Sequence, residues 1–99
     1  MSREKVINKV YDSSVADAIS LLPNTIKVFF NPLYDIKKTV NNDLDFMLGV
    51  FLSQVILVSS YYFEEINFTP TEEESGRFNY ILFSKAQEYK EQIKKIIEN

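Results

Sequence analysis

Hydrophobic positions are densest between Leu44 and Phe63, in the stretch LDFMLGVFLSQVILVSSYYF. Asp45 is the one charged residue of this stretch, and Gln54 lies near its middle. On a helical projection the apolar residues occupy most of the circumference, whereas a surface helix keeps them on one face. The pattern therefore predicts a long apolar helix over 43–66, with an Asn or Asp at its N-cap.

Helical periodicity also marks the residues before this stretch. Apolar side chains recur at three- to five-residue steps over 3–22, which predicts an amphipathic helix. Pro23 should end it, because the residue before a proline is pushed away from helical angles. We expect a short segment at 24–30, helical or extended, and then a helix from 32 to about 41 that begins at Asn31-Pro32.

A well-capped helix is predicted for the C-terminal third. Thr69-Pro70-Thr71-Glu72 offers an N-cap, a first-turn proline and a capping box, and the pair Thr71 and Glu74 repeats the box. A repeat of three and four residues then continues to the end, which predicts one helix over 70–98. A competing interpretation makes 77–83 a strand and begins the last helix at Ser84.

Together these elements predict a single domain, 1–99, of the all-α class. It would be a small bundle of four to five helices in which 43–66 and 70–98 form a long antiparallel hairpin. Composition supports this fold class, because two glycines and three prolines are too few turn residues for a sandwich or barrel. If 77–83 were a strand, the domain would instead be α+β.

Two residue types with wide catalytic use are missing, since the chain has no cysteine and no histidine. Serine–histidine and cysteine–histidine catalysis are therefore excluded within one chain, as are thiolate and imidazole metal sites. A carboxylate-dependent Mg²⁺ enzyme is one alternative, using Glu64 and Glu65 with the acids of 72–74. Glu64 and Glu65 are adjacent, however, and point about 100° apart on a helix. We expect no enzyme activity and no cofactor.

Charge is distributed unevenly along the chain. Residues 1–41 and 77–99 each carry a net charge of +2, whereas 42–76 holds seven acids and no base. This is not the basic footprint of a nucleic-acid-binding protein, so we expect no nucleic-acid partner. One alternative function uses the acidic middle, Asp43 to Glu74, in a small inhibitor or immunity-type protein that binds one partner.

The apolar helix needs more cover than 99 residues readily supply. Only one narrow strip is small or polar, formed by Asp45, Gly49, Ser53 and Ser60. Neighbouring helices could cover the flanks, a second chain could cover them, or the helix could span a membrane. Asp45, Gln54 and the acidic flanks argue against the membrane. We expect a homo-oligomer, most simply a dimer.

These expectations converge on a non-enzymatic protein-interaction or structural module that self-associates through apolar helix faces. Gly49-x-x-x-Ser53 would let another helix approach closely. The N-terminal residues lack the apolar run of a signal peptide, so we expect a cytoplasmic protein. The interface candidates are Gly49, Ser53, Ser60, Tyr61, Tyr62, Glu64 and Glu65.

Overall fold

A computed structural model describes residues 2–30 and 40–98, and in these two ranges the chain forms four helices and no strand. They are α1 (Arg3–Phe29), α2 (Asp43–Glu65), α3 (Glu72–Ser84) and α4 (Ala86–Glu98). The predicted helix 32–41 falls almost wholly outside the described residues. The all-α prediction is confirmed.

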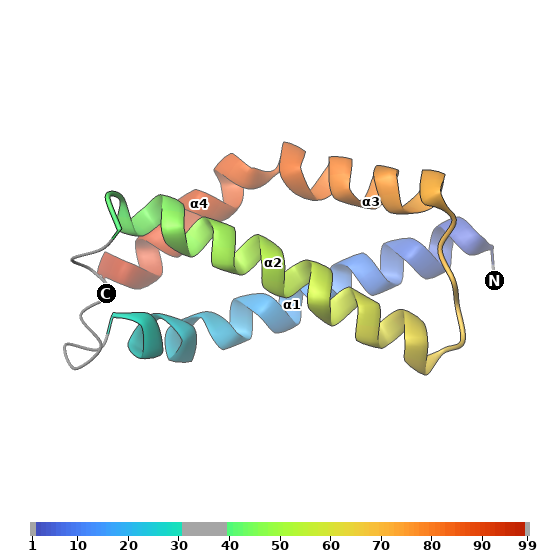
Figure 1. Ribbon diagram of the computed structural model, residues 1–99, viewed down its shortest axis with the longest axis horizontal. Helices are drawn as coiled ribbons and strands as arrows, with labels where there is room; N and C mark the ends of the chain where they lie inside the picture. The colour runs from blue at the N-terminus through green and yellow to red at the C-terminus, as the bar shows by residue number, and fades with distance from the viewer. Residues whose placement is uncertain (1, 31–39, 99) are drawn as a thin grey trace.

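The helices form an elongated bundle of 46 × 24 × 22 Å in which the chain runs along the long axis three times (Figure 1). α1 and α2 are antiparallel and make the most extensive helix pair, and α3 and α4 return together beside α2. The predicted hairpin of the second and last helical segments is therefore present, with its second arm divided into two helices.

α1 does not end at Leu22 but continues through Pro23 to Phe29, so the predicted stop is wrong. The segment at 24–30 is thus the last turns of α1 and is not extended. Pro23 is exposed, and the turns that follow it are held by α2. Phe29 packs edge-on against Phe46 at 5.4 Å between ring centroids, and Gln54 donates a hydrogen bond to the Thr25 hydroxyl at 3.2 Å. These tertiary contacts offset the missing backbone hydrogen bond.

The predicted single helix over 70–98 is interrupted at Lys85, and the alternative strand over 77–83 is wrong because those residues lie in α3. The Ser84 hydroxyl donates to the Ile81 carbonyl at 2.7 Å. The Lys85 N–H then bonds to the carbonyl of Leu82, 3.3 Å away, which is a tighter turn than an α-helix makes. Serine back-bonding of this kind bends helices, so it accounts for the change of direction.

The core is a single cluster to which every helix contributes. α2 lies at its centre, and its Phe51, Met47 and Val55 are almost completely buried. α3 reaches the buried interior through three side chains, Glu74, Phe78 and Leu82, and α4 through two. The remaining core side chains are Val10, Tyr11, Ala18, Leu22, Phe63, Tyr89 and Ile93.

Arg3 fastens the beginning of α3 to the beginning of α1. Its guanidinium donates to both carboxylate oxygens of Glu74, at 3.0 and 2.8 Å, and to the Thr69 carbonyl at 2.9 Å. It also lies 4.1 Å from the centre of the Phe68 ring. Glu74 closes a capping box with Thr71, so the N-cap of α3 is Thr71 and not Thr69. The hydrogen bonds from Arg3 and from the Thr71 N–H lower the pKa of Glu74 to about 2.

Candidate functional site

The outward face of α2 is the largest departure from ordinary helix patterning. Leu57 is 55% exposed and Tyr61 63%, and Ile56 is exposed as well. Only 28% of the most apolar 18-residue window of α2 is buried. A surface helix of a monomer normally turns charged and polar residues outward. We use the name "α2 face" for this surface, which consists of Gly49, Ser53, Ile56, Leu57, Ser60, Tyr61 and Glu64.

Five of the seven interface candidates lie on the α2 face. Gly49, Ser53, Ser60, Tyr61 and Glu64 are all exposed there, and Glu65 is exposed at the end of the helix. Tyr62 is elsewhere, because one residue turns a helix by about 100°. It is half-buried against α1, where its hydroxyl donates to the carboxylate of Asp17, and this hydrogen bond raises the pKa of Tyr62. Tyr62 therefore joins two helices of one chain.

Gly49 and Ser53 border a shallow surface hollow with a volume of about 660 Å³. A Cβ atom placed on Gly49 would meet no heavy atom of residues 2–30 or 40–98 within 4 Å. No helix in the described ranges therefore packs on Gly49, and the close helix approach predicted from Gly49-x-x-x-Ser53 is not made inside this bundle. The walls of the hollow are formed by Phe29, Asp45, Phe46, Val50, Gln54 and Leu57.

Gln54, which borders this hollow, has an unusual buried polar atom. Its amide nitrogen donates to Thr25, but its amide oxygen is buried and accepts no hydrogen bond from the residues that the structure describes. A buried acceptor without a donor costs roughly 1–3 kcal/mol. Gln54 thus borders the hollow and has a buried acceptor to which no described residue donates.

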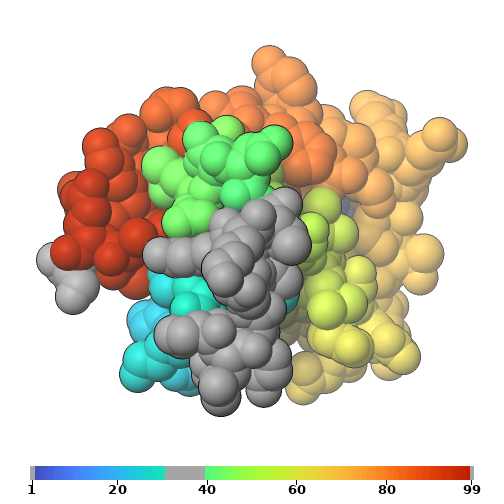
Figure 2. Space-filling model, turned by 60° about the vertical axis from the view of Figure 1, so that its left-hand side comes forward, coloured from blue at the N-terminus to red at the C-terminus, as the bar shows by residue number. Residues whose placement is uncertain are grey.

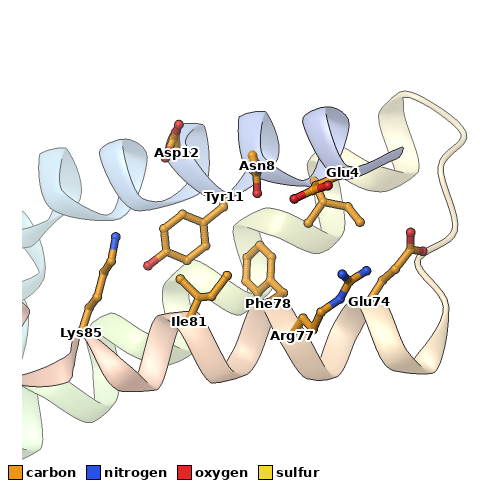
Figure 3. A pocket seen from close by; sticks show the side chains of 10 residues that line it. Glu4, Asn8, Tyr11, Asp12, Glu74, Arg77, Phe78, Ile81 and Lys85 are labelled. Atoms are coloured by element: carbon orange, nitrogen blue, oxygen red, sulfur yellow. The ribbon is translucent and has the colours of Figure 1, made fainter. Parts of the chain in front are cut away.

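A groove of about 410 Å³ runs between α1 and α3 (Figure 3). Tyr11, Phe78 and Ile81 project into it, and charged residues from both helices line its edges. The Tyr11 hydroxyl is already paired with the Tyr89 hydroxyl at 2.6 Å, and burial together with this hydrogen bond raises the pKa of Tyr11. The groove joins residues about 70 positions apart, so sequence reasoning had no local signal for it.

A second groove, of about 440 Å³, lies on the other side of α3, toward α2. Ile56, Ser60 and Glu64 form its α2 wall, so it continues the α2 face. Its floor includes Phe63 and Phe78. The two grooves exist because α3 rests on the bundle through a narrow line of side chains.

The acidic middle of the chain is divided between internal and exposed roles. Asp45 pairs with Lys90 at 2.7 Å, and Glu74 is held by Arg3. Glu64, Glu65, Glu72 and Glu73 are exposed near the turn between α2 and α3. Within the described ranges no three acidic side chains come close enough together to hold a metal ion. The acids therefore form neither one continuous surface nor a cluster with metal-ligand geometry.

Length and apolar composition would allow α2 to cross a membrane, and no other helix in the described ranges meets both conditions. Its mean hydropathy over 18 residues is 1.7. The central helix of a compact bundle satisfies the same conditions, and the inner side of α2 is packed in such a core. Comparisons of the chain with protein-family models, with curated proteins and with solved structures give no match.

Proposed function

We propose that this protein is a non-enzymatic, self-associating helical module, most simply a cytoplasmic homodimer, whose contact surface is the α2 face. The observation that carries the proposal is the exposure of Leu57 and Tyr61 on a helix whose opposite side builds the core. Contiguous exposed apolar surface of this kind marks sites of association.

The energetics of the α2 face favour a protein partner. Burying a leucine or phenylalanine side chain completely contributes about 1.5–3 kcal/mol. Leu57, Tyr61 and Ile56 lie within two helical turns, and the small exposed residues on the same face, Gly49, Ser53 and Ser60, leave the helix backbone accessible. A helix on a second chain could therefore approach closely and remove all three side chains from water.

The two alternative functions draw less support from the same surface. An acidic docking surface for a foreign partner would need free carboxylates along 43–74, but Asp45 and Glu74 are engaged inside the fold. A Mg²⁺ enzyme would need carboxylates at one point, and the described acids are dispersed. The apolar surface of α2 remains the feature that calls for a partner.

Light scattering coupled to size exclusion tests the proposal. We expect the mass to exceed the 11.6 kDa of one chain and to fall on dilution. Leu57→Glu should give a folded monomer, because it introduces a charge at the centre of the contact without touching the core. Tyr80→Glu is the matched control, since Tyr80 is 75% exposed on α3 and its replacement should leave the mass unchanged.

A strictly monomeric wild-type protein at every concentration would overturn the proposal. If the wild type and Leu57→Glu have equal masses, the contact surface is not the α2 face. Solubility only in detergent would instead favour the membrane alternative.

A further inference from the structure

We propose that the partner is a second copy of this chain bound antiparallel along α2, with Tyr61 of each copy in the hollow over Gly49 of the other. This inference rests on the proposed function and adds the geometry of the contact. It is carried by the match between the hollow on one half of α2 and the exposed side chains on the other half.

Small and large residues are arranged on α2 so that they complement each other. Gly49 and Ser53 are small, exposed and one turn apart, and Leu57 and Tyr61 continue the same row with large exposed side chains. A two-fold axis at the height of Val55 pairs position 49 with 61 and position 53 with 57. Each small residue then faces a large one, and the rise per residue places both pairs within about 9 Å of the axis along the helix.

Electrostatics also favour the antiparallel arrangement. A parallel pair would place Glu64 and Glu65 beside their own counterparts, with both negative helix ends adjacent. It would also place Tyr61 against Tyr61 and leave both hollows unfilled. In the antiparallel pair, the acidic last turn of each helix lies beside the positive N-terminal end of the other helix dipole, and position 65 falls opposite Asp45, whose charge Lys90 already balances.

The hollow suits a tyrosine side chain. Phe29, Phe46 and Val50 give it apolar walls, and Gln54 supplies a polar wall. A phenol has an apolar ring and a hydroxyl that donates one hydrogen bond. Tyr61 of the second copy would bring both to this hollow, with its hydroxyl on the side of Gln54.

Filling the hollow gives the first test. Gly49→Leu should weaken dimerisation at least tenfold, because the leucine occupies the space needed by Tyr61. The fold of each chain should be retained, since a Cβ atom on Gly49 has no neighbour within 4 Å among the described residues and leucine favours a helix more than glycine does. Gly76→Leu is the matched control, because Gly76 is a helical glycine on α3 with equally open surroundings. If Gly49→Leu dimerises as tightly as the wild type, the inference is wrong.

Introduced thiols give the second test, since the natural chain has no cysteine. We would mix Ser53→Cys and Leu57→Cys proteins under mild oxidation and count the three possible disulfide-linked dimers. The antiparallel register brings position 53 to position 57 of the other copy, so the mixed dimer should exceed both symmetric dimers well beyond the statistical ratio.

The outcomes separate this inference from the proposed function. A dimer by light scattering whose symmetric disulfides equal or outnumber the mixed one would overturn the register and leave self-association standing. A dimer that forms no disulfide through either position would also overturn the register. A monomeric wild-type protein would overturn both.

Discussion

Arg3 joins three parts of the chain at one point, the start of α1, the turn at Thr69 and the first turn of α3. Sequence reasoning found half of this arrangement. The capping box at Thr71 and Glu74 was visible because its partners are three residues apart. The ion pair was not, because 71 positions separate Arg3 from Glu74 and no local rule connects them.

The Arg3–Glu74 pair predicts a defined pH dependence of stability. The pKa of Glu74 is about 2 in the folded protein against an ordinary 4.5. Glu74 therefore contributes stability that is fully present above pH 4.5 and is lost as pH falls through 2. Arg3→Ala should lower the melting temperature at neutral pH and remove most of this acid-dependent loss.

Melting curves between neutral and acidic pH check this prediction. Lys9→Ala is the control, because it removes an exposed cation from the same helix and leaves Glu74 paired. If Arg3→Ala and Lys9→Ala show the same acid dependence as the wild type, the ion pair does not hold α3 in place.

At the scale of elements, the helical segments were predicted well, and the errors lie at the end of the first helix and at the break within the last one. The 43–66 helix agrees with α2 to within a residue because its apolar pattern and Asn42 cap are local. The predicted stop at Pro23 was wrong because helix propensity describes a segment without its tertiary contacts. In the structure, α1 beyond Pro23 is held by Phe46 and Gln54 of α2. The break at Lys85 was missed because the spacing of apolar residues carries no information about a serine hydroxyl that bonds to the backbone.

Pro23 gives a prediction at this scale. Proline inside a helix removes a hydrogen bond and strains the preceding turn, and its helical propensity is about 3 kcal/mol below that of alanine. Pro23→Ala should therefore raise the free energy of unfolding by about 1–3 kcal/mol, because Pro23 is exposed and no packing is lost.

Urea denaturation measures this change. Asn24→Ala, at the neighbouring exposed position, should yield no more than about 0.7 kcal/mol, since it changes propensity alone. Equal effects of the two substitutions would show that the proline does not strain α1.

At the scale of the whole molecule, the protein is a bundle whose central helix is packed on one side only. The apolar excess of Leu44–Phe63 predicted that some additional cover is needed. In the structure α1 and α4 cover the inner side of α2, and the groove between α2 and α3 leaves part of its outer side open (Figure 2 shows the end of the bundle at which α2 begins).

This incomplete cover predicts that stability depends on protein concentration. Association through the α2 face would stabilise the folded chain by mass action, so the melting temperature should rise with concentration. Leu57→Glu should melt at one temperature over the same range. Calorimetry over about a hundredfold concentration range distinguishes the two behaviours. A wild-type melting temperature that does not change with concentration would contradict dimerisation at the α2 face.

The sequence by itself determined the all-α class, the long apolar helix and the two candidate capping boxes at the start of α3, because each depends on residues a few positions apart. The strip through Gly49, Ser53 and Ser60 could also be predicted from the sequence, since helical geometry fixes which side chains share a face. Only the tertiary structure decided that none of the four described helices packs on Gly49, that Tyr62 turns inward to Asp17, and that Arg3 secures α3. These outcomes depend on how whole helices pack against one another, and packing brings together residues that no short window of sequence contains.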